Sequence, residues 1–158
     1  MNPRFETILE KKLIGNKSTM SFANYKIGEL WKIFMPKRHS IKNNLNSDLI
    51  SLTIYPPKFF TEFEPTRAFE KWAVIEVSDF ENTSTDFEKL ILPSGLYAVF
   101  NYKGSSNDNS IFKYIMQSWL PDSNYQLDNR PHFEVLGSKY KNNDPLSEEE
   151  IWIPIREK

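Results

Sequence analysis

The 158-residue sequence contains no cysteine, and that absence alone excludes several kinds of chemistry. Without thiols there is no disulfide, no cysteine nucleophile and no cysteine ligand for zinc or an iron–sulfur cluster. The only histidines, His39 and His132, are far apart in the sequence, so we expect no metal site. The five glycines form neither a dinucleotide-binding nor a phosphate-binding loop, and no GxSxG motif is present. We therefore expect no cofactor.

The sequence also lacks a charge excess and a long apolar run. Twenty Lys and Arg residues against twenty-one Asp and Glu residues give a net charge of −1, without the basic excess typical of nucleic-acid binding. The segment from Met1 to Glu6 has no apolar region of a signal peptide, and no run is long enough to span a membrane. We expect a cytoplasmic protein that does not bind nucleic acid or membrane directly.

Aromatic residues, by contrast, are abundant: twelve Phe, seven Tyr and four Trp. They supply core volume that the aliphatic residues do not, and some of them could line a site instead. The length suits one domain over residues 1–158, in which folding buries about 70% of the extended-chain surface.

The spacing of apolar residues predicts two amphipathic helices, over residues 24–35 and 109–120. Each is followed by a proline, Pro36 or Pro121, which we expect to end the helix because the residue before a proline avoids the α region. When the two helices are aligned so that Pro121 matches Pro36, their apolar positions also match. This match indicates an internal duplication.

Extended segments follow the same plan in both halves. One precedes each helix, at 12–21 and 96–102, and two follow it, at 49–55 and 72–77 in the first half and at 134–140 and 151–155 in the second. Each half, about 5–80 and about 90–156, is then strand, helix, strand, strand. The predicted fold class is α+β, a mainly antiparallel sheet with two helices and pseudo-twofold symmetry.

Alternation along these strands assigns side chains to two faces. We expect Ile50, Leu52 and Ile54 to pack under the first helix, as do Ala73, Ile75 and Val77 in the next strand. The other face would then carry two carboxylates and four large aromatic residues: Glu76, Glu134, Tyr55, Trp72, Tyr140 and Trp152.

Large aromatic side chains beside a carboxylate are typical of a site for an organic cation, which they attract by charge pairing and cation–π contact. Desolvation would raise the pKa of the carboxyl and would also equip it as a general acid. The alternative is ordinary packing, in which the segment 56–71 with its phenylalanines covers this face.

Four segments resemble motifs of the GyrI-like small-molecule-binding domain, the effector-binding domain of AraC-type and MerR-type transcription regulators. The strand 92–100 (LPSGLYAVF) resembles its P-x-G-x-Y-A-V-F strand, and 119–125 (WLPDSNY) resembles its W-L-P-x-S-x-Y helix end. The segments 130–135 (RPHFEV) and 150–155 (EIWIPI) resemble its F-E strand and its closing strand. The motifs occur in the family's order and span nearly the whole chain.

This resemblance implies a duplicated βαββ fold, related to SOUL domains, with a ligand groove between the halves. It implies Glu134 as the anchor for a cationic lipophilic ligand, with Tyr97 and Trp119 as further ligand-binding candidates. We expect a stand-alone member without a helix-turn-helix, acting in drug or effector binding. The alternatives are a hydrolase of reactive, cyclopropane-containing xenobiotics that uses Glu134, and a protein that modulates DNA gyrase.

Overall fold

A computed structural model describes residues 2–158 of the chain. The elements, in chain order, are the strands β1 (Arg4–Ile8) and β2 (Lys11–Met20), the helix α1 (Ile27–Lys37) with a 3₁₀ turn (Arg38–Ser40), the strands β3 (Leu49–Ile54), β4 (Phe69–Val77), β5 (Glu88–Leu92) and β6 (Gly95–Lys103), the helix α2 (Ser110–Tyr114), a π-helical turn (Ile115–Trp119), the helix α3 (Leu120–Asp122), and the strands β7 (Tyr125–Leu127), β8 (His132–Leu136) and β9 (Glu148–Glu157).

The predicted α+β class and the duplicated unit are confirmed. The first half runs β2, α1, β3, β4 and the second β6, α2 to α3, β8, β9, with β1, β5 and β7 as additions. Every strand pair is antiparallel, and the order across the sheet is β1-β6-β9-β8-β3-β4-β2-β5, with β7 paired to β9. The two halves therefore join where β3 pairs with β8.

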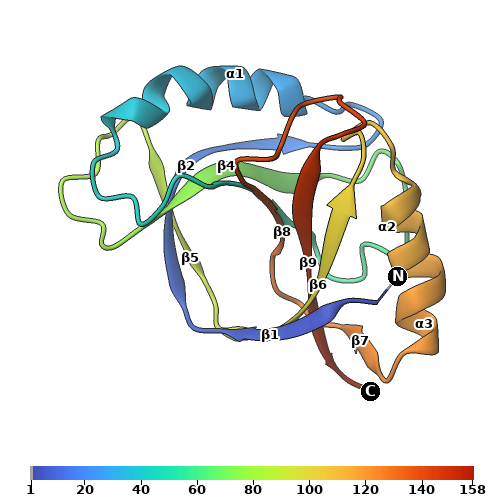
Figure 1. Ribbon diagram of the computed structural model, residues 1–158. Helices are drawn as coiled ribbons and strands as arrows, with labels where there is room; N and C mark the ends of the chain where they lie inside the picture. The colour runs from blue at the N-terminus through green and yellow to red at the C-terminus, as the bar shows by residue number, and fades with distance from the viewer. Residues whose placement is uncertain (1) are drawn as a thin grey trace.

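The sheet curls strongly, because strands near its opposite edges are joined by very short links. Residues 9–10 connect β1 to β2, and residues 93–94 connect β5 to β6. Figure 1 shows the resulting ring of strands, whose inner face carries a hydrophobic core. This inner core is formed by Ile8, Leu13, Ile50, Leu52, Trp72, Val74, Leu92, Tyr97, Val99 and Phe133.

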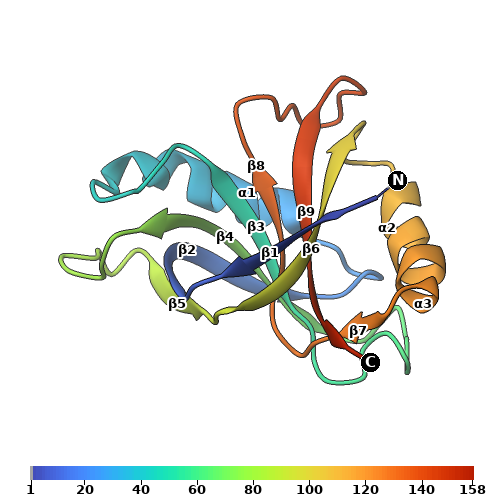
Figure 2. The same ribbon diagram turned by 60° about the horizontal axis from the view of Figure 1, so that its bottom comes forward.

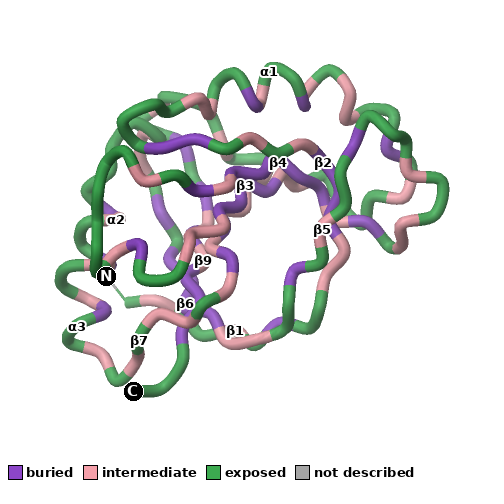
Figure 3. Tube along the Cα trace, turned by 180° about the vertical axis from the view of Figure 1, so that it is seen from behind, coloured by how far each residue is buried: buried purple, intermediate pink, exposed green. Residues whose placement is uncertain are grey.

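The helices cover the outer face, at two separate places. Leu30 and Phe34 of α1 pack on Ala73 and Ile75 of β4, and Ile111 of α2 and Ile115 of the π-helical turn pack over β6 and β9. Figure 2 shows α1 and α2 on opposite sides, with β8 and β9 between them. In Figure 3 the buried stretches follow the strands, whereas α1 buries only part of its surface.

The expected packing of β3 is wrong. Ile50 and Leu52 belong to the inner core, and the outer face of β3, which the helices share, carries Ser51 and Thr53 instead. The prediction allowed one apolar face per sheet, but a sheet that closes on itself has an apolar core inside and helix contacts outside. Ala73 and Ile75, by contrast, do lie under α1.

The prolines do not end the helices where we expected. Pro36 lies inside α1, which continues to Lys37, and Pro121 lies inside α3, so the second helical segment reaches Asp122. The fixed φ of proline is compatible with a helix, so each proline continues its helical segment at the cost of one backbone hydrogen bond. Among the described residues no helix is long and apolar enough to cross a membrane.

Replacing Gly15 in β2 with alanine is expected to destabilise the protein by about 2 kcal/mol, a typical cost of overpacking. An alanine Cβ there would lie 1.9 Å from the Ala73 carbonyl oxygen of β4, a backbone atom that can move only with its strand. The matched control is Gly28→Ala in α1, where a Cβ meets no atom within 4 Å and helix propensity predicts a small stabilisation. Chemical denaturation of both variants measures the difference, and equal midpoints would contradict the expectation.

Candidate functional site

A strip of polar side chains crosses the outer face of the sheet between the two helices, where the halves meet. The register places Ser51 of β3 opposite Glu134 of β8, and Thr53 opposite His132. Lys71 of β4 lies opposite Thr53 on the other side of β3. Lys71, Ser51 and Thr53 are buried, which is unusual for a lysine in particular. Because apolar clusters flank this strip on both sides, its polar groups need a structural or functional explanation.

Lys71 is the buried cation of this strip. Its Nζ donates a hydrogen bond to Thr53 Oγ1 at 2.8 Å, and no carboxylate of residues 2–158 lies within 4.0 Å of it. Burial lowers the pKa of the Lys71 ammonium, an effect that attraction from Glu134 and Glu149 opposes. Lys71 therefore acts on the two glutamates through space and not through a direct ion pair.

Glu134 and Glu149 form a pair of neighbouring carboxyl groups. Both lie on the outer face, on the adjacent strands β8 and β9, and their side chains are within hydrogen-bonding reach of each other. Burial raises the pKa of Glu134, against the opposing effects of Lys71 and of the contact with Glu149. Burial, with the charge of Glu134, raises the pKa of Glu149 to about 8. The pair therefore keeps a proton at neutral pH.

Tyrosines surround the pair. Tyr55 follows β3, and its ring packs against Phe60 and His132 with centroids 4.8 Å and 4.9 Å away. Tyr25, before α1, and Tyr140, in the loop between β8 and β9, both lie close enough to Glu134 to interact with its charge. Burial raises the pKa of Tyr25 to about 12. These hydroxyls thus stay protonated and can donate hydrogen bonds.

The site is deep but remains reachable. Desolvation is the largest influence on Glu134, yet this residue keeps intermediate solvent exposure, as do His132 and Tyr55. Tyr25 is half exposed, and Phe22, which packs beside it, is 45% exposed. Burial, with the positive charges of Lys71 and Arg130, lowers the pKa of His132 to about 3, so the imidazole is neutral and adds no charge. The accessible part of the site is therefore aromatic with one acidic centre.

The structure brings together three of the predicted ligand-binding residues and separates the others from them. Tyr55, Glu134 and Tyr140 lie at the site described above. The expected shared face is wrong for Trp72, Glu76 and Trp152, which belong to the inner face, and the further candidate Tyr97 also lies on the inner face.

The inner-face residues have structural partners. The indole N–H of Trp72 donates to Glu70 at 2.7 Å, and the Tyr97 hydroxyl donates to the Pro131 carbonyl at 2.8 Å. Trp152 stacks on Phe133 with ring centroids 5.1 Å apart. Glu76 forms an ion pair with Lys11, with Nζ 3.3 Å from Oε2. These contacts account for the four residues as packing on the side of the sheet away from Glu134.

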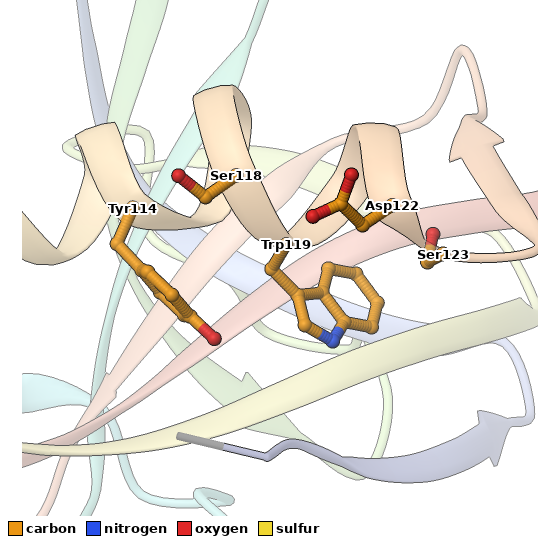
Figure 4. Close-up of a pocket in the computed structure, with 5 residues that line it drawn as sticks. All are labelled: Tyr114, Ser118, Trp119, Asp122 and Ser123. Atoms are coloured by element: carbon orange, nitrogen blue, oxygen red, sulfur yellow. The ribbon is translucent and has the colours of Figure 1, made fainter.

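Trp119 lies elsewhere on the outer face. Its ring contacts Phe100 of β6 and Phe5 of β1, at 5.1 Å and 6.3 Å between centroids. It lines a cavity of about 190 Å³ with Tyr114, Ser118, Asp122 and Ser123. In Figure 4, Tyr114 and Trp119 extend from the same side of the helical segment, and Asp122 follows toward its C-terminal end. Trp119 is thus placed at a cavity that Glu134 does not line.

Sequence reasoning missed three residues of the site: Lys71, Glu149 and Tyr25. Lys71 lies two residues before Ala73, and Glu149 lies two residues before Ile151. Alternate residues of a strand share a face, so this spacing predicts that both charged residues lie on the outer face. Glu149 lies in the acidic run 148–150, and a run of like charges is typical of a solvated segment. Tyr25 precedes α1 in a segment without a strand pattern, and no sequence signal indicates its position.

Fold and site together define an effector-binding domain. The family described as integron-associated effector binding protein, Cass2, matches residues 6–155. The chain belongs to this family, and small-molecule binding is its class of function. No curated protein sequence matches the chain.

Solved structures share the fold. An integron cassette protein from the mobile metagenome of Vibrio cholerae has a TM-score of 0.69 and 19% identity, covering 98% of this chain and 96% of its own. SAV2435 bound to tetraphenylphosphonium has a TM-score of 0.65 and 18% identity, and the match covers 99% of this chain and 94% of SAV2435. The C-terminal domain of EcmrR has a TM-score of 0.67 and 19% identity, and the match covers 98% of this chain and 97% of the EcmrR domain.

Proposed function

We propose that this chain binds a small hydrophobic organic cation over the outer-face site, with Glu134 as the charge anchor. One observation carries the proposal: Glu134 is a desolvated carboxyl with no cation within 4.0 Å among residues 2–158, and it remains accessible between tyrosines. A buried carboxylate without a close counter-ion is unfavourable by itself and is stabilised by an arriving positive charge.

The aromatic side chains supply the rest of the recognition. Tyr25, Tyr55 and Tyr140 present ring faces and hydroxyls near Glu134, and exposed Phe22 extends the aromatic surface outward. Such rings bind apolar parts of a ligand by burial of area and a cation by attraction to the π-system. A lipophilic cation satisfies both requirements, and the tetraphenylphosphonium bound by SAV2435 belongs to this class.

As a role, we propose drug or effector binding or sequestration, of the kind performed by the effector domain of a transcription regulator. Effector binding needs no chemical step. The outer-face site offers a charge anchor and an apolar wall, which are the elements of a specific binding site for a small molecule.

Hydrolysis of a reactive xenobiotic is the second candidate, favoured by the raised pKa of the carboxyl pair. Burial keeps a proton on Glu149 or Glu134 near neutral pH, where a general acid is useful. An enzyme would convert its ligand, with a rate that falls as this proton is lost. A recovered, unchanged ligand after prolonged incubation would favour binding alone.

Titration calorimetry with tetraphenylphosphonium and with neutral triphenylphosphine oxide tests the binding proposal. We expect saturable binding of one cation per chain, about tenfold or more tighter than the neutral compound, because one desolvated charge contact is worth more than 1.4 kcal/mol. Calorimetry is preferable to tryptophan fluorescence, since Trp72 and Trp152 lie on the inner face. Equal affinities for the two compounds would refute a charge anchor.

A further inference from the structure

We propose that an organic cation enters this site in exchange for a proton, which Glu149 gives up. The inference rests on the proposed function and adds to it how the site balances charge. Glu149 would then be a second specificity-determining residue, which acts on the ligand together with Glu134.

The placement of the two carboxyl groups favours a shared proton. Glu134 and Glu149 lie on the same face of the adjacent strands β8 and β9, and each charge disfavours the other, so the pair is more stable when one member holds a proton. Glu149 is 9% exposed, and its Oε2 is buried without a hydrogen-bond donor among the described residues. An ionised Glu149 would thus be a buried charge facing a like charge, which is strongly unfavourable.

Lys71 does not remove this requirement. Its ammonium is hydrogen-bonded to Thr53 and lies more than 4.0 Å from both carboxyls, so neither glutamate has a direct ion pair. With one shared proton the pair carries a single negative charge, which Lys71 offsets from a distance. The cluster is therefore close to neutral before a ligand arrives, and a cation that enters makes it positive unless a proton leaves.

The other titratable groups around the pair are poor proton sources. They are Tyr55 after β3, His132 of β8, Tyr25 before α1, Tyr140 of the β8–β9 loop and Tyr102 of β6, which pairs with Glu149 in the register. Burial raises the pKa of each tyrosine, and His132 is already neutral. Near neutral pH the proton must come from the carboxyl pair or from Lys71.

Glu149 is the better source because it is in contact with the anchor. A cation held at Glu134 attracts a second carboxylate beside it, so it favours ionisation of Glu149. The cation also disfavours the Lys71 ammonium, but Lys71 keeps its hydrogen bond to Thr53 and lies more than 4.0 Å from Glu134. The sign of the pH dependence follows: below about pH 8 the free pair holds the proton, and cation affinity rises with pH. With one proton released, the slope is about tenfold per pH unit, and it levels off above that pH. A neutral ligand shows no such slope.

The test is calorimetry with tetraphenylphosphonium at several values between about pH 6 and pH 9, in buffers of different ionisation enthalpy. The dependence of the measured heat on the buffer gives the number of protons released. We expect about one for the native chain below pH 8 and none for triphenylphosphine oxide. In Glu149→Gln, whose amide can replace the shared proton as a donor to Glu134, we expect no release and a flat pH profile.

The outcomes separate the two proposals. No tetraphenylphosphonium binding at any pH would overturn the proposed function. Binding without proton release in the native chain would overturn the exchange alone. Release that persists in Glu149→Gln and disappears in Lys71→Met would overturn the role of Glu149. An unchanged circular dichroism spectrum and a cooperative thermal transition in each variant show that it still folds.

Discussion

Replacing Glu134 with glutamine is expected to weaken tetraphenylphosphonium binding about 30-fold or more while changing the affinity for triphenylphosphine oxide only a few-fold. Glutamine keeps the shape and hydrogen-bonding capacity of the side chain and removes only its charge. Losing one member of a buried charge contact costs about 2–5 kcal/mol, and 2 kcal/mol is roughly 30-fold in affinity. Burial still disfavours ionisation of Glu149 in this variant, so Glu149 is a weaker anchor than Glu134.

The matched control for this change is Glu76→Gln. Glu76 is also a strand glutamate and was also predicted from the sequence to bind ligand, but it lies on the inner face and pairs with Lys11. We expect no change in the affinity for either compound. If Glu134→Gln weakens the cation and the neutral compound equally, Glu134 shapes the site without anchoring charge. If Glu76→Gln has the larger effect, the ligand lies elsewhere.

The fold was predictable because duplication constrains it. The order strand, helix, strand, strand repeats in both halves, and the antiparallel sheet follows from that order. The closure of the sheet was not predictable from alternation, since it depends on residues 9–10 and 93–94, which link strands near opposite edges. Pattern analysis therefore located the elements and misjudged which face of β3 the helices cover.

The site was predictable in part, because alternate residues of a strand lie on the same face of the sheet. Glu134 and Tyr55 were assigned to one face by parity, and the register confirms that Glu134 shares its face with Ser51 and Thr53. Trp72 and Trp152 were assigned to that face because Ala73 and Ile151 were taken as the core of the opposite one. In the structure Ala73 and Ile151 lie on the outer face, and a one-residue error in parity moves a side chain through the sheet.

The last prediction concerns the residue that pattern analysis had no reason to suspect. Replacing Lys71 with methionine is expected to strengthen tetraphenylphosphonium binding by about tenfold at about pH 8, and by less at about pH 6. A positive charge about 6 Å from a bound cation, in an effective dielectric of about 20, opposes it by roughly 3 kcal/mol. Methionine fills a similar volume without the charge, and Thr53 loses the hydrogen bond that it accepts from Lys71.

The pH dependence follows from what Lys71 does to its neighbours. Its charge lowers the pKa of both Glu134 and Glu149, so its removal leaves them protonated to a higher pH. At about pH 6 that extra proton cancels part of the gain, because a neutral pair attracts a cation weakly. Toward higher pH the gain shrinks as well, because burial lowers the pKa of Lys71 and the native ammonium then loses the charge that opposes the ligand.

Lys11→Met is the control, since Lys11 is a strand lysine whose partner, Glu76, lies on the inner face, and it should leave cation binding unchanged. Weaker cation binding in Lys71→Met would mean that Lys71 positions Glu134 and does not oppose the ligand. Stronger binding would mean that the positive charge of Lys71 repels the cations that the site binds. Such a lysine lowers the affinity for permanent cations in general. A cation that also carries a hydrogen-bond acceptor for Lys71 would therefore bind more tightly than tetraphenylphosphonium, which has none.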